Sequence, residues 1–374
     1  MLHKYRIFIT STAQVMKKLI CLIVLFVTIR GIANSQPALR VVVAGLNHDH
    51  VHGILSQFNK GTVNIIAIVE PDIALQQKFA KRYQLPDSLF SPDLKKVLTA
   101  KKPDAVLGYN AVAHHVDLVE ICAPLGIDVM VEKPLAATLE QARKMEALAK
   151  RYGIKVLTNF ETTWYPSYQQ VYDWVAADSI GAIRKIVAHD GHQGPKEIGC
   201  SPAFLNWLTD PVGNGAGALN DFGCYGADLM TWLMKGARPI AVTAVVRQYK
   251  PDVYPKVDDD ATVLVEYKNA LGQIEASWNW PCSIKDLEVF GETGYYHALD
   301  GKNIVTRMRE HRVSRLTVKE LPAPINDPIT YLSAVLRDKI SGRADQSSLE
   351  YNMIVMEILD AAKRSTASGK RIVL

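Results

Sequence analysis

Four short apolar runs, separated by segments of helical character, constrain the fold of the first half of this chain. Each run is continuous rather than alternating, as is typical of strands that are buried on both faces of a parallel sheet. The regular alternation of strand and helix predicts βαβ units and therefore a doubly wound parallel sheet. The runs are LRVVVAG (39–45), VNIIAIVEPD (63–72), DAVLGY (104–109) and DVMVEKP (128–134).

A different pattern begins after Thr158 and continues to the C-terminus. Strand-like segments such as IAVTAVVRQY, ATVLVEYKN and QIEASWNW follow one another closely, which favours an antiparallel sheet. The last helical segment ends at Gly369, a residue typical of a helix C-cap. A chain of 374 residues also exceeds the usual size of one hydrophobic core. We therefore predict an α/β chain: a Rossmann-type dinucleotide-binding domain over 36–158, and an α+β domain with a large open, mainly antiparallel sheet over 159–374.

Residues 1–35 have the pattern of a signal peptide. A basic pair, KK, precedes the apolar run LICLIVLFVTI (19–29), and the small residues Ala33 and Ser35 are spaced for signal peptidase. The apolar run is too short for a transmembrane helix, which needs about 20 residues. We therefore expect cleavage near Ser35/Gln36, export to the periplasm or out of the cell, and no stable membrane span in the mature chain.

The positive charge of the chain comes from this first segment. The chain has 43 Lys and Arg against 38 Asp and Glu, and residues 1–35 contain five basic residues and no acidic ones. The remaining chain is balanced, so its charge gives no reason to expect nucleic acid or an anionic membrane as a partner. A small neutral ligand fits better. Four scattered cysteines remain after the first segment, without a C-x-x-C pair, and we expect no essential disulfide among them.

The first predicted strand leads into a loop that lacks two of three expected glycines. Dinucleotide-binding turns have the pattern G-x-G-x-x-G, whose glycines permit the tight turn, the approach of the pyrophosphate and close packing of helix on strand. Gly45 keeps the first position, whereas Asn47 and His50 occupy the second and third. Glu70 ends the second strand, where a carboxylate typically binds ribose hydroxyls and repels a 2′-phosphate. If a dinucleotide binds, NAD is therefore expected rather than NADP.

The histidine-rich segment 48–52 allows three interpretations: an altered cofactor loop, a metal site, or the start of a surface helix. In a helix, His48 and His52 are four residues apart and able to bind one metal ion. His114 or His115 is a candidate third ligand, but the sequence identifies no carboxylate ligand. We expect the loop to face NAD, with its histidines as added donors near the pyrophosphate or the substrate, and we expect no metal ion.

A second landmark is the triplet Glu132-Lys133-Pro134, which ends a buried strand and precedes a helical segment. Ligands bind at the carboxyl ends of strands in open α/β sheets, so Lys133 is a candidate active-site residue. At this point the chain resembles the glucose-fructose oxidoreductase and inositol dehydrogenase family, Gfo/Idh/MocA. The resemblance covers nearly the whole mature chain, and its specific blocks are VMVEKPLAATLEQARKM (129–145), YPSYQQVYDWVAADSIGAIRKI (165–186) and GAGALNDFGCYGADLMTWL (215–233).

The resemblance implies a set of catalytic residues. Lys133, Asp221, Gly223 and Asp228 match the family's site motifs, and Tyr225 stands where many members have a histidine. Asp221 and Tyr225 are four residues apart on a predicted helix, so their side chains share a face. We expect Tyr225 to act as acid and base with its pKa lowered by the Lys133 ammonium group. Lys133 is then expected to polarise the substrate oxygen, and Asp221 to orient the sugar.

The same resemblance implies a homo-oligomer, a cofactor site and a sugar site. Aromatic rings stack on the apolar faces of sugars, and the candidates to line the sugar site beside Lys133, Asp221 and Tyr225 are Trp164, Tyr165, His192, Trp207, Trp278 and Trp280. The residues expected at the cofactor site are Gly45, Asn47, His48, His50, Glu70, Asn110, His115, Glu132 and Lys133.

Three activities are open at this point. The resemblance favours an NAD(P)-dependent oxidoreductase that acts on a secondary hydroxyl of a sugar or glycoside and transfers hydride to nicotinamide. Because NAD is scarce outside the cytoplasm, an exported enzyme is expected to keep NAD bound and to be redox-neutral overall, which includes a glycosidase that works by transient oxidation and elimination. The altered glycine loop favours a third interpretation, a non-catalytic sugar-binding homologue, whereas the complete set of Lys133, Asp221 and Tyr225 disfavours it.

Overall fold

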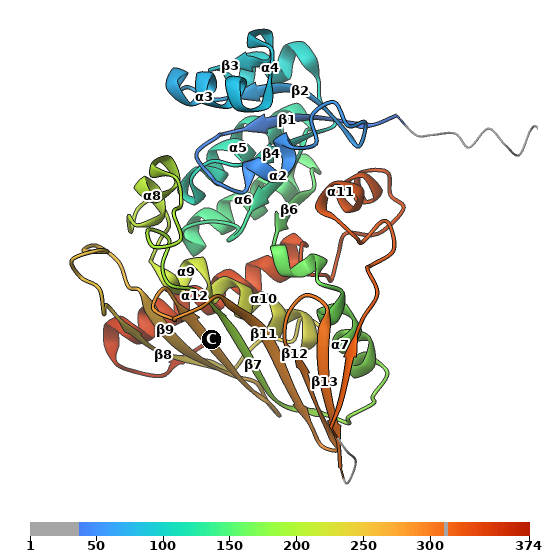
Figure 1. The fold of residues 1–374 in the computed structure, drawn as a ribbon, viewed down its shortest axis with the longest axis vertical. Helices are drawn as coiled ribbons and strands as arrows, with labels where there is room; N and C mark the ends of the chain where they lie inside the picture. The colour runs from blue at the N-terminus through green and yellow to red at the C-terminus, as the bar shows by residue number, and fades with distance from the viewer. Residues whose placement is uncertain (1–36, 310–312) are drawn as a thin grey trace, which may run out of the picture. The chain divides into compact units, whose positions relative to one another are not determined.

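The computed structural model describes residues 37–309 and 313–374, and the segment from Leu39 to Leu374 forms one compact unit. The predicted signal peptide, residues 1–35, lies outside the described residues. Two β-sheets organise the described chain, one from its first half and one from its second half (Figure 1). Within 37–309 and 313–374, no helix has the length and apolar character needed to cross a membrane.

The first sheet confirms the predicted doubly wound architecture. Its six strands are all parallel, because the chain returns to the same end of the sheet through a crossover after each strand. The strand order places β1 between β2 and β4. In sheet order the strands are β3 (Phe90–Ser91), β2 (Val63–Val69), β1 (Leu39–Ala44), β4 (Ala105–Gly108), β5 (Asp128–Glu132) and β6 (Val156–Asn159).

Helices cover both faces of this sheet, which explains why its strands are continuous apolar runs. In β1, Val41 and Val43 belong to one buried cluster, whereas Val42 and Ala44 belong to the other. One helix of the first face, α11, comes from the far C-terminal part of the chain. The helices of the first face are α2 (Val51–Leu55), α3 (Ile73–Tyr83) and α11 (Pro328–Leu336), and those of the second are α4 (Leu94–Lys101), α5 (His115–Cys122) and α6 (Leu139–Tyr152).

The strand order creates a switch point between β1 and β4. The loop after β1 leads to a helix on one face and the loop after β4 to helices on the other, so a crevice opens at the carboxyl ends of these strands. Gly45 makes the turn after β1 with φ +90, and a Cβ added there would lie 2.7 Å from the backbone of Asn110. Only glycine therefore allows the two loops to approach this closely.

The second sheet is mainly antiparallel, as predicted, but contains one parallel pair. β7 and β10 run parallel because the chain passes through three helices and two further strands between them, which gives the long crossover that parallel pairing needs. In sheet order the nine strands are β14 (Ser314–Thr317), β13 (Asn303–Met308), β12 (Gly294–Ala298), β11 (Ile284–Gly291), β7 (Ile183–Gly191), β10 (Leu271–Ser277), β9 (Asp260–Glu266), β8 (Ala241–Arg247) and β15 (Ile372–Val373).

One face of the second sheet packs against helices, and its strands alternate buried with partly exposed residues (Figure 1). The longest of these helices, α12, ends at Gly369 with φ 64, which confirms the predicted C-cap. The buried side chains of β7, β9, β10 and β11 belong to the same core as the helices above them. The helices on this face include α7 (Pro166–Ala176), α10 (Gly223–Leu233) and α12 (Leu349–Ser368).

Candidate functional site

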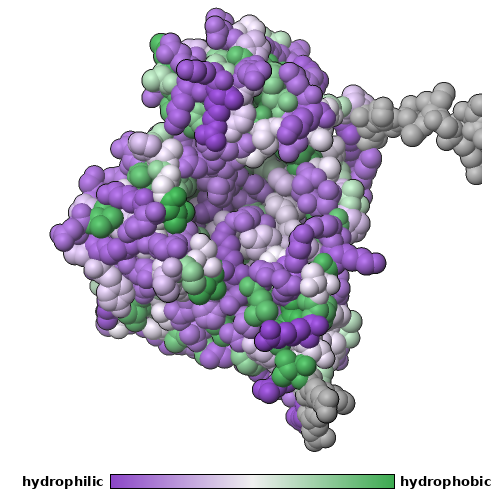
Figure 2. All heavy atoms as spheres, in the orientation of Figure 1, coloured by the Kyte–Doolittle hydropathy of each residue, from purple (hydrophilic) through white to green (hydrophobic). Residues whose placement is uncertain are grey.

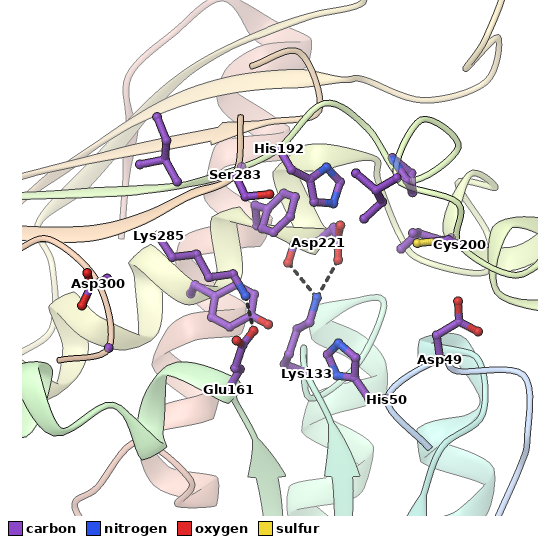
Figure 3. A pocket seen from close by; sticks show the side chains of 18 of the residues that line it. Asp49, His50, Lys133, Glu161, His192, Cys200, Asp221, Ser283, Lys285 and Asp300 are labelled. Carbon is purple, nitrogen blue, oxygen red and sulfur yellow. Dashed lines mark hydrogen bonds and ion pairs between the residues drawn. The ribbon is translucent and has the colours of Figure 1, made fainter. Parts of the chain in front are cut away.

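A cavity of about 630 Å³ lies at the carboxyl edge of the first sheet, and both halves of the chain contribute to its wall. The surface is hollowed on the face shown in Figure 2, and hydrophilic residues surround the hollow. A second cavity of about 760 Å³ lies beside α2 and α11, and His50 and Glu161 border both. The polar residues of the first cavity include His50, Lys133, Glu161, His192, Asp221 and Lys285 (Figure 3). Tyr225 also lines this cavity.

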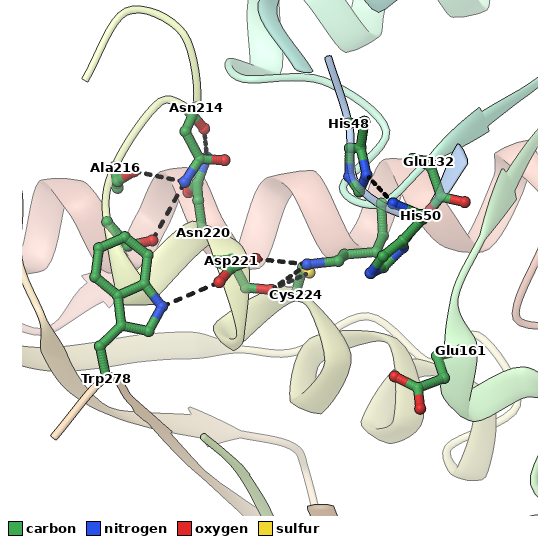
Figure 4. Close-up of polar contacts among 12 residues, drawn as sticks. His48, His50, Glu132, Glu161, Asn214, Ala216, Asn220, Asp221, Cys224 and Trp278 are labelled. Atoms are coloured by element: carbon green, nitrogen blue, oxygen red, sulfur yellow. Dashed lines mark hydrogen bonds and ion pairs between the residues drawn. The ribbon is translucent and has the colours of Figure 1, made fainter. Parts of the chain in front are cut away.

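The centre of the first cavity is a buried ion pair between Lys133 and Asp221 (Figure 3). Lys133 follows directly on β5, and Asp221 ends the short helix α9 (Ala218–Asp221). The Lys133 Nζ donates to Asp221 Oδ1 at 2.5 Å and to the Asp221 carbonyl at 3.0 Å. The second carboxylate oxygen accepts the indole N–H of Trp278 at 3.0 Å (Figure 4). Asp221 is thus fixed on both sides, and it holds the ammonium group at the cavity wall.

Electrostatics keep both members of this pair charged. Burial alone would lower the pKa of Lys133, but its neighbours, with Asp221 the first among them, together raise that pKa to about 12. Burial would raise the pKa of Asp221, and Lys133 outweighs it in turn, so the pKa of Asp221 lies below its usual value. The site therefore presents a permanent cation next to a cavity large enough for a sugar.

Tyr225 lines the first cavity as predicted, but its expected acidity is wrong. The Lys133 Nζ lies 5.0 Å from the centre of the Tyr225 ring, and the Lys285 Nζ lies 4.6 Å from it. Both cations lie over the ring, so they make cation–π contacts. Burial, followed by the charge of Glu161, raises the pKa of Tyr225 well above 10. Tyr225 is consequently a phenol that donates a proton, not a phenolate.

Glu161 and Lys285 are charged residues of the first cavity that were not predicted from the sequence. Glu161 pairs with the Lys285 ammonium group and accepts the Tyr165 hydroxyl at 2.7 Å. Burial would raise the pKa of Glu161, but Lys285 outweighs it and lowers that pKa. Glu161 lies two residues beyond the end of β6, so the rule that identified Lys133 at a strand end identifies it too. Lys285 belongs to the second sheet, and no local pattern distinguishes it.

The predicted sugar-site aromatics divide into three groups. Tyr165 and His192 line the first cavity, and Trp164 lines the second. Burial lowers the pKa of His192, which keeps its ring neutral. The other three do not line either cavity: Trp278 holds Asp221, Trp207 bonds the loop after β1, and Trp280 packs against Gly191, so these are supporting residues rather than stacking platforms.

The family motif also includes Asp228, and the structure places it away from the cavity. Asp228 lies on α10, fully buried, and burial followed by the charge of Asp345 raises its pKa well above the usual value. Its expected place in the site is therefore wrong. Asp221 ends α9, and Tyr225 lies in the first turn of α10, so the expectation of one continuous helix is also wrong even though both side chains reach the cavity.

The loop after β1 is covered by a helix that the sequence pattern did not predict, α8 (Pro202–Leu208). The indole N–H of Trp207 donates to the Asn47 carbonyl at 3.0 Å. The Asp49 carboxylate accepts the backbone N–H of Ser201, the N-cap residue of α8, at 2.8 Å. His48 is buried beside the ring of Trp207. The His48 ring thus packs against the aromatic side chains of α8, Phe204 and Trp207.

Glu70 is engaged inside the same loop. It is buried, and its two carboxylate oxygens accept the backbone N–H groups of Leu46 and Asp72 at 2.8 and 2.9 Å. Burial raises the pKa of Glu70. Neither cavity described above is lined by Glu70 or Asn47.

Three of the predicted cofactor residues carry buried polar atoms without a hydrogen-bond partner. These atoms are Asn47 Oδ1, Asn110 Oδ1 and His115 Nε2. Buried polar atoms almost always have a partner, which in a binding crevice is a ligand or an ordered water. Burial lowers the pKa of His115 to about 4, so its ring is neutral. Together with the tight turn at Gly45, these atoms fit a dinucleotide held between the β1 and β4 loops.

The histidines of the loop do not group as the sequence suggested. His52 bonds the Tyr83 hydroxyl at 2.6 Å, and exposed His114 bonds Asp117 at 2.7 Å. The His115 ring faces the Leu135 carbonyl at 3.1 Å. His48 and His52 therefore share no site, and the expected third ligands lie elsewhere.

His48 instead lies beside His50 and the buried Glu132, the first residue of the EKP triplet (Figure 4). The His50 ring donates from Nδ1 to Glu132 Oε2 at 2.8 Å. The carboxylate that the sequence did not identify is therefore Glu132.

The fold and the site together define a two-part oxidoreductase architecture, and comparison with known families agrees. Residues 39–160 match the family model described as oxidoreductase family, NAD-binding Rossmann fold, and residues 168–297 match the GFO/IDH/MocA C-terminal domain. The chain belongs to the Gfo/Idh/MocA oxidoreductase family, as its sequence motifs predicted.

The chain is similar in sequence to diol dehydrogenases and in fold to other oxidoreductases. It is 25% identical over 267 residues to the trans-1,2-dihydrobenzene-1,2-diol dehydrogenase of Sus scrofa, covering 70% of this chain and 73% of that protein. The structure of an aldose-aldose oxidoreductase from Caulobacter crescentus matches with a TM-score of 0.75 and 19% identity, covering 90% of this chain and all of that one. An inositol dehydrogenase homologue from Azotobacter vinelandii in complex with NAD+ matches with a TM-score of 0.77 and 17% identity, covering 91% and 98%. At these identities the two structures show a shared fold.

Proposed function

We propose that this enzyme oxidises a secondary hydroxyl group of a sugar or glycoside, with NAD rather than NADP as the hydride acceptor. The observation that carries the proposal is the buried Lys133–Asp221 pair, which presents an ammonium group to a polar cavity at the carboxyl edge of the first sheet. The names of similar proteins, a dihydrobenzenediol dehydrogenase, an aldose-aldose oxidoreductase and an inositol dehydrogenase homologue, support the substrate class.

Different residues of the cavity bind the substrate and transfer its proton. Lys133 donates a hydrogen bond to the reacting oxygen and stabilises negative charge that develops there, while Asp221 holds the Lys133 side chain in place. Oxidation releases the proton of the substrate hydroxyl. The Glu161 carboxylate, which Lys285 keeps ionised in the same cavity, accepts that proton through Tyr225, whose phenol takes up the substrate proton as it releases its own. Glu161 and Lys285 bind further hydroxyl groups of the sugar, for which a carboxylate and an ammonium group offer acceptors and donors.

The cofactor is proposed to lie between the β1 and β4 loops. Asn47, Asn110 and His115 would hold it through the polar atoms that lack partners, and Gly45 leaves room for its backbone contacts. When bound, its nicotinamide ring accepts a hydride from the carbinol carbon. Glu70 supports NAD over NADP, since a buried carboxylate at the end of β2 disfavours a 2′-phosphate nearby.

A second candidate is a redox-neutral enzyme that keeps its NAD bound, either coupling two sugar reactions or cleaving a glycoside by transient oxidation and elimination. The covering of the β1 loop by Trp207 and α8 favours it, because a covered loop slows exchange of a dinucleotide. Export of the mature chain and a homo-oligomer are parts of the proposal that rest on the signal-like segment 1–35 and on the family resemblance.

The test combines cofactor content with turnover. The chain purified after its own processing is denatured, and the released NAD(H) and NADP(H) are quantified; the enzyme is then assayed with free sugars plus an electron acceptor and with nitrophenyl glycosides. Formation of NADH supports the dehydrogenase, and release of nitrophenol without net NADH supports the redox-neutral glycosidase.

Two tyrosine variants separate the site from the core. Tyr225→Phe is expected to lower kcat by about 100-fold, since general acid–base groups typically contribute 100- to 10,000-fold. Tyr168→Phe is the matched control, because Tyr168 is a fully buried tyrosine that lines neither cavity. Equal loss in both variants, or normal turnover in Tyr225→Phe, contradicts the assignment.

A further inference from the structure

His48, His50 and Glu132 bring three ligand atoms of metal-binding type together at one point of the crevice. Each residue offers one atom, and the three atoms lie within 4.8 Å of one another. The group joins two loops of the first sheet, since the histidines follow β1 and Glu132 ends β5. The parallel sheet brings these chain segments together although they are more than 80 residues apart in sequence.

Glu132 is a buried carboxylate that forms no ion pair with a lysine or arginine among the described residues. Its side chain is 2% exposed, and its one ion-pair partner in residues 37–309 and 313–374 is the His50 ring. The adjacent lysine, Lys133, is committed to Asp221 on the other side of the strand end. A buried carboxylate is costly unless a cation or a metal ion neutralises it.

A hydrogen bond from Asn159 orients the same carboxylate. The Asn159 side-chain N–H donates to Glu132 Oε1 at 2.7 Å and leaves Oε2 directed at His50. Hydrogen bonds of this kind fix the orientation of carboxylates that ligate metals. Glu132 is therefore held in place from one side and open to a ligand on the other.

We propose that His48, His50 and Glu132 bind one divalent transition-metal ion of the Zn²⁺ class. Two imidazoles and one carboxylate form the donor set that Zn²⁺ adopts in catalytic sites, where a fourth position remains open. Mg²⁺ and Ca²⁺ prefer all-oxygen sites, so two nitrogen ligands select against them. The ion takes the place of the hydrogen that His50 and Glu132 share at 2.8 Å, with a small outward movement of the half-exposed His50 ring.

The open position of the metal faces the cavities. His50 borders both of them, and Lys133 lines the first beside it. A sugar oxygen or a water molecule from either cavity can therefore complete the coordination. The metal ion is thus a ligand of the loop histidines that the proposed redox activity does not require.

Metal binding is tested on the full processed chain, without reference to turnover. The chain is treated with a chelator, checked for folding by circular dichroism and titrated with Co²⁺, whose visible absorption bands report nitrogen and oxygen ligands; bound Zn²⁺ is counted by atomic emission in a separate sample. One equivalent of each ion is expected. Glu132→Gln and His50→Gln are expected to weaken binding at least about 100-fold.

Two matched variants control for adventitious histidine binding. His52→Gln lies in the same loop, and His114→Gln removes an exposed histidine; both residues have partners of their own and should leave the metal affinity unchanged. A folded chain that takes up no stoichiometric Co²⁺, or equal affinity in Glu132→Gln and the original chain, overturns the proposal. Because the readouts are spectra and metal content, their failure leaves the redox proposal untouched, and absence of NAD leaves the metal result standing.

Discussion

The two sides of the crevice, the loop after β1 and the end of β5, differ in how closely their residues match the family pattern. The β5 side keeps the charged residue typical of the family, Lys133, and fixes it with a buried ion pair. The β1 side has lost two glycines, carries a buried imidazole, and is covered by α8. The β5 side thus matches the family motif, whereas the β1 side departs from the glycine pattern of dinucleotide-binding loops.

Both sides depend on the second half of the chain, but through different forces. Asp221 and Trp278 fix Lys133 through a charged hydrogen bond and its support. Trp207 fixes Asn47 through one neutral hydrogen bond. Breaking a buried ion pair typically costs about 3–5 kcal/mol, whereas a neutral hydrogen bond contributes about 0.5–1.5 kcal/mol. Variants on the β5 side should therefore have the larger effects.

Lys133→Met should have the largest effect of all. It removes the donor to the reacting oxygen, so kcat/KM is expected to fall on the order of 1,000-fold. It also leaves the Asp221 carboxylate buried without a cation, which should lower the free energy of unfolding by about 3–5 kcal/mol. Urea unfolding and steady-state kinetics at a temperature where the variant is folded measure the two effects separately.

The double variant Lys133→Met/Asp221→Asn distinguishes charge from packing. Asp221→Asn removes the stranded charge and keeps an acceptor for Trp278, so stability should recover while activity stays low. If the double variant is as unstable as Lys133→Met, the pair stabilises the fold through packing, and the contrast between the two sides of the crevice fails.

Lys363 extends the comparison because it is a partly buried lysine without an ion pair in the described chain. Its Nζ donates to the Ala137 carbonyl at 3.0 Å, and burial lowers its pKa to about 8 from the ordinary 10.5. The unfolded chain therefore binds more protons between pH 8 and pH 10.5, and stability should rise with pH across that window by roughly 2–3 kcal/mol. Below pH 8 both states are protonated and the contribution is constant.

Lys363→Met should remove that rise. The variant cannot take up a proton, so its free energy of unfolding should change less than that of the original chain between pH 8 and pH 10, as measured by urea denaturation at both values. Other groups that titrate in this range are common to both proteins and cancel in the difference. An identical pH dependence in the two proteins contradicts the assignment to Lys363.

Local sequence patterns predicted most of the fold and the residues of the site that lie at strand ends. Continuous apolar runs predicted the parallel sheet, and the position of Lys133 at a strand end predicted its place in the cavity. The same rule also predicts Glu161, which lies two residues beyond the end of β6. Local patterns succeed here because strand ends of a parallel sheet meet at one edge whatever the rest of the chain does.

The remaining features depend on contacts between distant segments. Burial of the Glu132 carboxylate beside His50, closure of α8 over Asn47 and the approach of Lys285 to Tyr225 each join residues at least 60 positions apart. The pKa of Tyr225 was mispredicted for the same reason. The sequence indicates which charges are present, but the depth of burial and the face of the ring that a cation approaches are set by packing.

Trp207→Phe should have the smallest effect, and it tests the β1 side of the crevice directly. Phenylalanine keeps a ring beside His48 but loses the hydrogen bond to the Asn47 carbonyl, which should loosen the cover over the loop by about 1 kcal/mol. The rate of NADH binding to nucleotide-free protein, followed by stopped-flow fluorescence, should rise about fivefold. Trp174→Phe is the matched control, since Trp174 packs against Tyr296 on the second sheet, away from the loop. If both variants bind NADH at the original rate, α8 does not gate the crevice, and the two sides differ in sequence but not in access.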